Sequence, residues 1–449
     1  MLLLLFILRF GVQFFPTGEI RSIDAYYNRA FVLFEDGLVV LNSINNERIF
    51  SKPIEDGRLL IYDHEYGDLY ILTKTKLFRY LEGSEHLTEF PLGGIRPKRI
   101  GVGKGYIYLE TGSGYYRLRK GSFNIEKTNE VSATRWQEEL NRRNLGQYPI
   151  LTPYYFTDNL LNKYPITAVR EYNRKLWVGS GLGLHMVDII SARKEHIALW
   201  PIADVLKITD LDTTIAFISK NQISFYSLAG DSWYYRSYLQ DIVDITTYQN
   251  RIYLGTKGGL FTVSSGITLP VFRNPIITLT KAGNIIYFYS GSRLLALTPS
   301  STLPIELVTI TGNVNRITVF NNQVYIGADR GLYTIDTTGL RDEIIDPRGY
   351  FKFGIDDIVT TDGEMLIIAN GHLVSYRDSF DYLPINDGSS LALSKDRVWI
   401  GTRAGIWFYK DGKVDRWFRL PSTPVYSILE KKGYLWAATE QGLYRVPVY

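Results

Sequence analysis

Few residues in this chain have the types and spacing that catalysis or metal binding requires. The chain contains no cysteine, which excludes disulfides, thiolate metal sites and a cysteine nucleophile. Its histidines are far apart in the sequence and show no metal-ligand spacing: His64, His86, His185, His196 and His372. We therefore predict no catalytic residue, no metal site and no bound cofactor.

Acidic residues gather in three places, Asp56/Asp63, Asp210/Asp212 and Asp356/Asp357/Asp362. None of these groups matches a calcium-binding loop, which alternates acidic residues around a central glycine. Hydrolysis of a glycosidic bond needs two carboxylates opposed across the substrate, and sequence spacing alone cannot show such placement. A carbohydrate-active enzyme therefore stays an alternative interpretation.

The glycine-rich run from Gly179 to Gly183 superficially resembles a dinucleotide-binding loop. It follows an apolar strand but precedes a second strand, so no helix N-terminus is present to bind a phosphate. We interpret the run as a hairpin turn that contains an extra glycine.

Composition describes an ordinary globular protein of 449 residues, 45% hydrophobic and 21% charged. With 50 basic and 46 acidic residues the formal net charge is +4, a balance that favours neither nucleic acid nor a membrane surface as partner. Residues 1–9 are apolar up to Arg9 and resemble the core of a secretory signal. We expect an exported protein without a transmembrane segment, because no apolar stretch is long enough to span a bilayer.

The elements that must position any site follow from an internal repeat. The stretch Val398–Trp407 is a short apolar strand, a glycine-containing turn and a second strand, and versions of it recur along the chain at a period of about 37 residues. The apolar residue that opens the second strand marks each copy: Leu38, Leu77, Tyr115, Leu184, Ile223, Leu260, Leu294, Leu332, Leu373, Ile406 and Leu443.

Each repeat predicts four short antiparallel strands. In the eighth copy the strands fall at 314–320, 323–327, 331–335 and 341–345, with turn residues between them. A four-stranded unit of this kind cannot bury both of its faces alone, and such units arranged radially form a β-propeller. The predicted fold is an all-β propeller built from about 11 blades, with a short helical insertion.

The second strand of the repeat reads Leu176-Trp177-Val178-Gly179, and related runs occur at 252–256, 324–327 and 435–439. This pattern resembles the two-component-regulator propeller repeat, whose core is Leu-Trp-Val/Ile-Gly-Thr-x-x-Gly-Leu-x-x-Tyr. In that family the propeller is an extracytoplasmic sensing or docking module attached to a kinase. The present sequence has no kinase region, so the resemblance implies the fold and a docking role but not signalling.

Eleven blades exceed the usual number in one ring, so either one large ring or two packed propellers is expected. We favour two, one from blades one to three with nine to eleven, the other from blades four to eight. Residues 10–16 parallel the outer strand at 415–421, which predicts that the N-terminal strand completes the last blade. The expected segments are 1–9 (signal-like), 10–130 (blades one to three), 131–165 (insertion), 166–345 (blades four to eight) and 346–449 (blades nine to eleven).

The insertion interrupts the repeat period. Val131 to Leu145 looks helical, because Thr134 and Gln137 have capping-box spacing. Its aromatic residues either fasten the insertion onto the propeller or bind a partner: Trp136, Tyr148, Tyr154, Tyr155, Phe156 and Tyr164.

The functional expectation is a non-enzymatic scaffold that presents propeller loops to a partner in the cell envelope or outside the cell. The expected partner is a protein, with a glycan as the alternative. Two other interpretations stay open, a carbohydrate-binding or carbohydrate-active propeller and a structural subunit of an envelope assembly.

Overall fold

The computed structural model describes residues 13–81, 86–122, 124–158, 160–197, 204–220, 222–230, 232–237, 241–249, 251–264, 267–301, 303–310, 312–321, 323–335, 341–361 and 363–448. The signal-like segment 1–9 and Asp362 lie outside these residues, as does the side chain of His196. The chain divides into two compact units, an N-terminal unit of residues 14–203 and a C-terminal unit of residues 204–449 together with 1–13.

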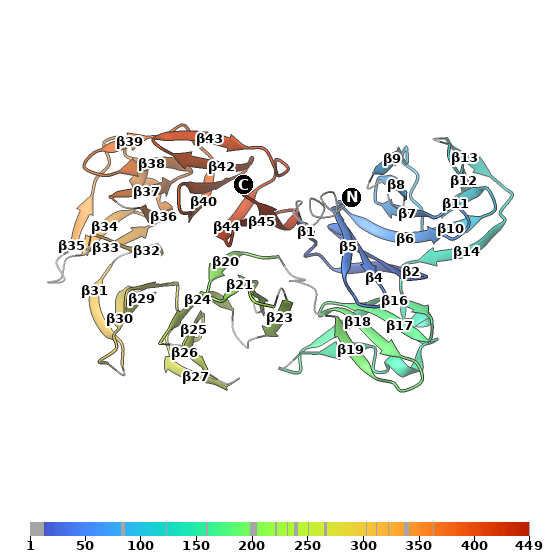
Figure 1. The fold of residues 1–449 in the computed structure, drawn as a ribbon, viewed down its shortest axis with the longest axis horizontal. Helices are drawn as coiled ribbons and strands as arrows, with labels where there is room; N and C mark the ends of the chain where they lie inside the picture. Colours follow the sequence, from blue (N-terminus) through green and yellow to red (C-terminus); the bar gives the residue numbers. More distant parts are fainter. Residues whose placement is uncertain are drawn as a thin grey trace. The chain divides into compact units, whose positions relative to one another are not determined.

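Nearly all described elements are β-strands, arranged in eleven antiparallel sheets. The N-terminal unit holds four of these sheets, drawn in blue to green in Figure 1. Its elements are β2 (Ile20–Tyr26), β3 (Arg29–Phe34), β4 (Gly37–Asn42), β5 (Arg48–Pro53), β6 (Gly57–Asp63), β7 (Asp68–Thr73), β8 (Lys76–Leu81), β9 (Leu87–Pro91), β10 (Arg99–Gly103), β11 (Tyr106–Thr111), β12 (Gly114–Arg119), β13 (Ile125–Thr128), β14 (Ala133–Glu138), α2 (Arg142–Leu145), the 3-10 turn η1 (Pro149–Leu151), β15 (Tyr155–Thr157), β16 (Lys163–Tyr172), β17 (Lys175–Ser180), β18 (Gly183–Asp188) and β19 (Lys194–Ile197).

The C-terminal unit holds the other seven sheets, drawn in green to red in Figure 1. Its elements are β20 (Lys207–Asp210), β21 (Thr214–Ile218), β22 (Gln222–Ser227), β23 (Ser232–Ser237), β24 (Ile242–Tyr248), β25 (Arg251–Thr256), β26 (Gly259–Ser264), β27 (Ile267–Phe272), β28 (Thr278–Ala282), β29 (Ile285–Ser290), β30 (Arg293–Leu297), β31 (Ile305–Thr309), β32 (Val314–Phe320), β33 (Gln323–Ala328), β34 (Gly331–Ile335), β35 (Arg341–Ile344), the 3-10 turn η2 (Tyr350–Phe353), β36 (Ile355–Thr361), β37 (Glu364–Ala369), β38 (His372–Tyr376), β39 (Phe380–Tyr382), β40 (Gly388–Leu393), β41 (Val398–Thr402), β42 (Gly405–Lys410), β43 (Lys413–Trp417), β44 (Val425–Lys431), β45 (Tyr434–Thr439) and β46 (Gly442–Pro447). The short strand β1 (Gln13–Phe15) is the outer strand of the last sheet, in the order β1-β46-β45-β44.

The inner strands of the C-terminal unit form a closed ring. Each first strand packs against the next, in the order β20, β24, β28, β32, β36, β40 and β44, and β44 packs against β20. A hydrogen bond from the backbone N–H of Ile208 to the Ser427 hydroxyl oxygen (3.0 Å) joins the first blade of the ring to the last. The all-β propeller of four-stranded blades predicted from the repeat is confirmed.

The N-terminal unit has a different arrangement. Its inner strands pack in the order β16, β2, β6 and β10, so the fourth sheet neighbours the first. After β13 the chain returns and β14 pairs with β10, which adds a fifth strand on the inner side of the third sheet. Side chains of β14 reach both β2 and β6, so this strand occupies the centre of the four-sheet unit.

The favoured grouping of the blades was wrong. Sheets one to four form one unit and sheets five to eleven the other, instead of one to three with nine to eleven and four to eight. The reason is that a repeat period specifies the blade but not its neighbours in the ring. The neighbours are decided by the edges of inner strands, such as β20 against β44, that lie far apart in sequence.

The helix predicted for Val131 to Leu145 was also wrong over most of its length. Ala133–Glu138 is the strand β14, and the only helix in this stretch is the four-residue α2. The Thr134 hydroxyl donates to the backbone carbonyl of Val102 (3.0 Å) on β10 instead of capping a helix. Pairing with β10 thus decides the conformation of a segment whose local spacing also suits a helix.

The glycine of the repeat lets neighbouring blades approach closely. A Cβ on Gly179 of β17 would lie 2.5 Å from Ile20 Cγ2 on β2, and one on Gly327 of β33 would lie 2.6 Å from Ile355 Cγ2 on β36. The side chain from the first strand of one blade therefore fills the space above the glycine of its neighbour. This contact explains why glycine follows the Trp-Val pair in the repeat.

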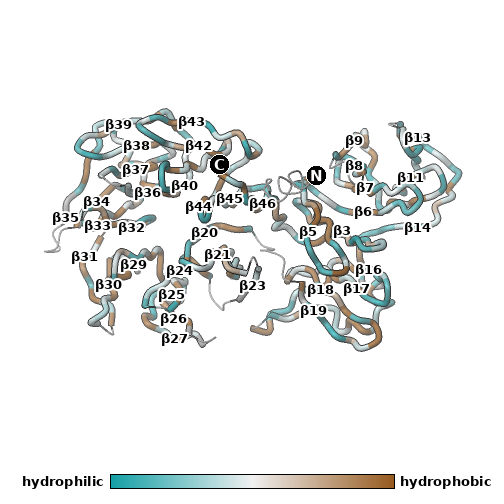
Figure 2. The backbone as a smooth tube through the Cα atoms, in the orientation of Figure 1, coloured by the Kyte–Doolittle hydropathy of each residue, from teal (hydrophilic) through white to brown (hydrophobic). Residues whose placement is uncertain are grey.

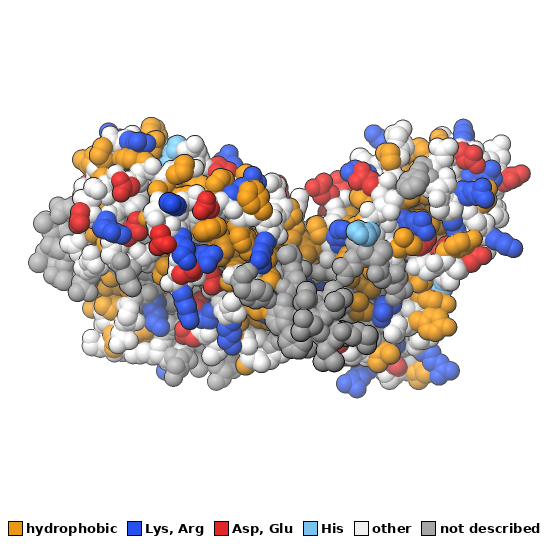
Figure 3. Space-filling view, turned by 45° about the horizontal axis from the view of Figure 1, so that its top comes forward, with side chains coloured by type: hydrophobic (Ala, Val, Ile, Leu, Met, Phe, Trp, Pro, Cys, Tyr) orange, Lys and Arg blue, Asp and Glu red, His pale blue; other side chains and the backbone are white. Residues whose placement is uncertain are grey.

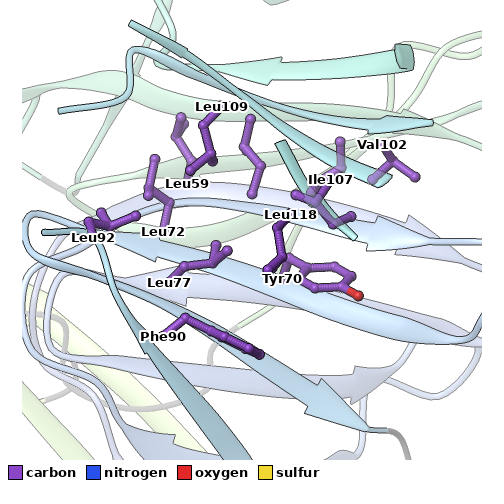
Figure 4. Packing of buried hydrophobic residues seen from close by; sticks show 12 residues of the cluster. Leu59, Tyr70, Leu72, Leu77, Phe90, Leu92, Val102, Ile107, Leu109 and Leu118 are labelled. Atoms are coloured by element: carbon purple, nitrogen blue, oxygen red, sulfur yellow. The ribbon is translucent and has the colours of Figure 1, made fainter. Parts of the chain in front are cut away.

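Hydrophobic cores lie between adjacent sheets. In Figure 4, Leu59, Leu72 and Leu77 of the second sheet point toward Ile107 and Leu109 of the third, and all five are fully buried. Hydrophobic stretches, brown in Figure 2, recur along the strands of both units. Burial between sheets stabilises the blades, because each blade has no second layer of its own.

We expect Gly179→Ala to lower the free energy of unfolding by about 1 to 3 kcal/mol, because the added methyl overlaps Ile20. Gly112→Ala is the matched control in the same unit, since its nearest contact would be the flexible Lys98 Nζ at 3.8 Å. Urea unfolding of both variants measures the difference. Equal losses of stability would contradict the close-approach explanation.

Asp36 has a pH-dependent role near the start of β2. Its carboxylate accepts hydrogen bonds from the backbone N–H groups of Thr17 (2.6 Å) and Gly18 (2.9 Å). Burial nevertheless raises the pKa of Asp36 to about 6, from 3.8. Because the folded-state pKa lies above the unfolded value, protonation of Asp36 stabilises the folded state. This stabilisation is fully present below about pH 4 and is lost as the pH rises through 6.

We expect the Asp36 side-chain NMR signal to titrate with a midpoint near pH 6. The Asp36→Asn variant should show a flatter dependence of unfolding free energy on pH between 4 and 7. A midpoint below pH 4.5 would contradict the assignment.

Candidate functional site

In the N-terminal unit, a cluster of hydrogen-bonded polar groups surrounds Asp24 on β2. The side chain of Asp24 is fully buried. Its carboxylate accepts from the backbone N–H groups of Ala25 (3.0 Å) and Tyr62 (2.8 Å). Two guanidinium groups complete the site, Arg135 of β14 at 3.0 Å and Arg170 of β16 at 2.9 Å. One carboxylate therefore connects four strands, β2, β6, β14 and β16.

The contacts around Asp24 stabilise the structure of the unit. The Asp24 carboxylate accepts hydrogen bonds from two backbone amides and from the Arg135 guanidinium, and it forms an ion pair with Arg170, so its negative charge is compensated. Arg135 also donates to the backbone carbonyl of Tyr62, and the Gln137 amide donates to the Ser22 hydroxyl (3.3 Å). Arg135 and Gln137, two residues apart on β14, therefore contact Asp24 and Ser22, two residues apart on β2.

Above this cluster, the turns between first and second strands carry a group of aromatic side chains. Tyr26 lies 4.7 Å from Tyr27 and 4.0 Å from His64, measured between ring centroids, and 5.4 Å from Tyr62. The backbone N–H of Tyr27 donates to the Tyr172 hydroxyl (2.6 Å) of the fourth sheet. Three sheets therefore contribute to one aromatic surface.

The outer members of this surface are open to solvent. Tyr27 is 71% exposed and Tyr66 is 56% exposed. The Lys120 ammonium lies 4.6 Å from the centre of the Tyr66 ring and forms an ion pair with Asp63 at 2.6 Å. We call Tyr26, Tyr27, His64, Tyr66 and Tyr172 the aromatic face.

Partial burial lowers the pKa of His64 below its usual value of 6.5, and the nearby positive charge of Arg135 lowers it further. The imidazole is therefore mainly neutral at pH 7. A neutral histidine beside tyrosines makes this face aromatic in character with little charge of its own.

Two cavities lie at the other end of β2. The first, of about 190 Å³, is lined by residues of β2, β14, β16 and the segment after β14, including Trp136 and Tyr148. The second, of about 360 Å³, is lined by charged residues that include Arg21, Arg58 and Glu139. Arg21 and Leu140 line both cavities.

The six aromatic residues predicted in the insertion fall into two places. Trp136 and Tyr148 line the 190 Å³ cavity. Trp136 also contacts Arg99, whose guanidinium lies 4.9 Å from the ring centre, and its ring covers Gly101. Burial raises the pKa of the Tyr148 hydroxyl.

The other four aromatics belong to the fourth sheet or the turn before it. Phe156 and Tyr164 face each other across β15 and β16, and Phe156 stacks on His185 at 3.9 Å. The Tyr164 hydroxyl donates to Asp158 (3.2 Å), and Lys163 lies 5.0 Å from the centre of the Tyr155 ring. Tyr154 is half-buried at a positive φ of 66°. Contact of these residues with a partner stays a prediction.

Charged pairs also line the inner strands of the C-terminal unit. Lys207 of β20 contacts Asp244 of β24 at 2.5 Å, and Arg316 of β32 contacts Asp357 of β36 at 2.5 Å. Burial lowers the pKa of Lys207, whereas Asp357 raises that of Arg316. Asp357 also accepts from the backbone N–H of Leu391 (2.8 Å), so these pairs connect adjacent blades.

One groove in the C-terminal unit has a volume of about 610 Å³ and lies at the hairpin turns of three consecutive blades. Asp396 lies in its wall, held by Arg397 (2.9 Å) and Lys410 (2.6 Å). These contacts lower the pKa of Asp396, so its carboxylate is ionised throughout the physiological range. Asp396, Arg397 and Lys410 in the groove wall are therefore paired with one another.

The described members of the acidic groups noted in the sequence are engaged separately, each by its own partner. Asp56 pairs with Lys74, Asp210 pairs with Lys431 (2.5 Å), and Asp356 accepts from the backbone N–H of Gly371 (3.0 Å). Within the described residues, no three His, Asp or Glu side chains are placed to hold a metal ion. Figure 3 shows acidic and basic side chains interspersed with hydrophobic ones across the surface.

Sequence reasoning missed the aromatic face. Tyr26 and Tyr172 each close a first strand and stand before an Asn-containing turn, the same position as Tyr248 and Phe320. The latter two are buried, at 3% and 7% exposed. The aromatic residue at the end of each first strand could therefore be recognised in the sequence. Its exposure to solvent in the N-terminal unit, however, depends on which sheets are neighbours.

Comparison with known proteins shows the fold alone. No protein-family model matches the chain, and no curated protein matches it. Among solved structures it is similar to PorZ, described as an essential bacterial surface component of the type-IX secretion system of Porphyromonas gingivalis, with 12% identity and a TM-score of 0.52 over 96% of this chain and 74% of that one.

A second solved structure is the extracellular domain of the putative one component system BT4673 of B. thetaiotaomicron. It shares 11% identity with this chain, with a TM-score of 0.49, over 96% of this chain and 71% of that one. The propeller fold that the resemblance to two-component-regulator-type propeller proteins implies is confirmed by the four-stranded blades of the structure itself. Across the described residues, no helix is both long enough and apolar enough to cross a membrane.

Replacing Arg135 by Gln should raise the pKa of His64 toward 6.5, because a positive charge that disfavours the imidazolium is removed. NMR titration of the histidine ring measures this shift. Arg397→Gln, in the C-terminal unit, is the control and should leave His64 unchanged. A lower pKa in Arg135→Gln would contradict the proposed electrostatic connection.

Proposed function

We propose that this chain is a non-enzymatic binding module of the cell envelope or exterior, and that the aromatic face of its N-terminal unit binds a protein partner. The observation that carries this proposal is the pair of solvent-exposed tyrosines, Tyr27 at 71% and Tyr66 at 56%, on a surface assembled from three sheets. Tyrosine is among the residues that contribute most to binding energy in protein interfaces.

The aromatic face is held in place before any partner arrives. The backbone of Tyr27 is anchored by the Tyr172 hydroxyl, and the ring of Tyr26 packs between Tyr27 and His64. An ordered side chain loses little conformational entropy on binding, so more of the contact energy remains as affinity. A scaffold of paired strands that presents fixed aromatic rings suits a docking role.

The polar clusters of the unit support a binding role over catalysis. Asp24, a fully buried carboxylate, is already engaged by two arginines and two backbone amides. A general acid needs a proton it can donate, and a general base a free lone pair, within reach of the substrate. The contacts around Asp24 instead hold four strands in register.

Two further parts of the proposal concern the insertion and the location. The insertion aromatics, among them the half-buried Tyr155 of β15, form a second contact region for the partner. Export to the periplasm, the envelope or the exterior is proposed from the apolar residues 1–9. The fold similarity to PorZ, a bacterial surface component, is compatible with that location.

The double variant Tyr27→Ala, Tyr66→Ala should lose partner binding by at least tenfold while its melting temperature stays within about 2 °C, because both rings are largely exposed. The measurement is cross-linking of the purified chain to envelope fractions, quantified by mass spectrometry, followed by titration of the captured protein. Phe418→Ala removes a 78% exposed ring in the C-terminal unit and is the matched control.

Retained binding in the double variant, or equal loss in the control, would contradict the assignment of the partner surface to this face. A partner captured only in the cytosolic fraction would contradict the proposed location.

A further inference from the structure

The two cavities at the end of β2 opposite the aromatic face are adjacent, and together we call them the polar recess. They share Arg21 and Leu140 in their walls, and their volumes are about 190 Å³ and 360 Å³. The smaller cavity is lined by residues of the inner strands β2, β14 and β16. Its floor includes Arg170, which is fixed by the ion pair with Asp24 at 2.9 Å.

The smaller cavity combines aromatic and amide side chains. Trp136 and Tyr148 supply two aromatic rings, and Gln137, Asn144 and Gln147 supply three amide groups. Each amide offers both donors and an acceptor, and a tyrosine hydroxyl does the same. Such a lining can bond several hydroxyl groups at once while an aromatic ring covers an apolar C–H surface.

The charged side chains of the cavity walls are engaged in ion pairs. Arg21 forms ion pairs with Glu19 and Glu35, both at 2.8 Å. Glu138 accepts from the Asn144 amide at 2.9 Å and lies 3.4 Å from Arg99. Arg170, also in the lining, shares the carboxylate of Asp24 with Arg135. The remaining amide and aromatic groups of the lining carry no charge, and they suit a neutral polar ligand.

We propose that this cavity binds one neutral sugar ring, the terminal unit of a glycan, with the next unit in the larger cavity. The smaller cavity, of about 190 Å³, is too small for a long ligand. The aromatic rings pack on the sugar C–H groups, and the amides bond its hydroxyls. This site is separate from the aromatic face and goes beyond the proposed protein-binding function.

The position of the segment after β14 supports this assignment. Glu139 pairs with Arg58 of β6, and Asn144 bonds to Glu138, so the segment is tied to the unit on both sides of Leu140. Tyr148 begins the turn η1 without a side-chain capping bond. Tyr148 thus follows this tied segment directly and lines the same cavity as Trp136.

The test uses the full chain and saturation-transfer NMR with D-glucose, D-galactose, D-mannose, N-acetyl-D-glucosamine and D-glucuronate as probes. The double variant Gln147→Ala, Tyr148→Ala should weaken binding of the best neutral sugar by at least tenfold, which corresponds to about 1.4 kcal/mol. Tyr148→Phe keeps the ring and removes one hydroxyl, so it should weaken binding less than the double variant.

Tyr27→Ala, Tyr66→Ala serves as the control at the opposite end of β2 and should bind the sugar as the wild type does. Its loss of protein binding is scored separately, so failure of one site is distinguishable from failure of the other. The sugar site is overturned if no neutral sugar gives a signal, if the Gln147→Ala, Tyr148→Ala variant binds equally well, or if glucuronate binds tenfold tighter than every neutral sugar.

Discussion

The N-terminal unit depends on the compensation of one buried charge, the carboxylate of Asp24. An ionised carboxylate removed from water is strongly unfavourable unless every lone pair finds a donor. Here two backbone amides and the Arg135 guanidinium donate to it and Arg170 forms an ion pair with it, and these groups come from four strands. The same requirement fixes the strands that carry the aromatic face at one end of β2 and the polar recess at the other. Both surfaces are therefore built on a framework that tolerates little movement between its sheets.

The two units solve the same packing problem in different ways. In the C-terminal unit the first strands of seven sheets close a ring, and the charged pairs Lys207–Asp244 and Arg316–Asp357 each connect neighbouring strands of that ring. In the N-terminal unit the first strands of four sheets do not close a ring. The strand β14 fills the space between them, and its residues Arg135 and Gln137 contact β2. The irregular segment in the repeat is thus where the structure supplies the missing central contacts.

Local sequence determined the blades well and their neighbours poorly. The apolar strand, the turn and the glycine of runs such as Leu176–Gly179 identify β17 and its equivalents, because burial and close approach act within a few residues. Ala133–Glu138 was misassigned since its conformation depends on pairing with β10, about thirty residues away. The exposure of Tyr27 likewise follows from the sheet arrangement. Trp136 and Tyr148 could be singled out as aromatics, but their shared cavity could not be anticipated without the position of β16.

Closure of the seven-bladed ring has a consequence for the time course of folding. The hydrogen bond between Ser427 and Ile208 joins residues 219 positions apart, whereas the hairpins within each blade are local. Local hairpins can form in microseconds, but the last contact must overcome the loop-closure entropy of the whole unit. During synthesis on the ribosome the edge of β20 stays uncovered until β44 has emerged. During that interval the surface of β20 that β44 later covers stays exposed, which raises the risk of aggregation before the ring closes.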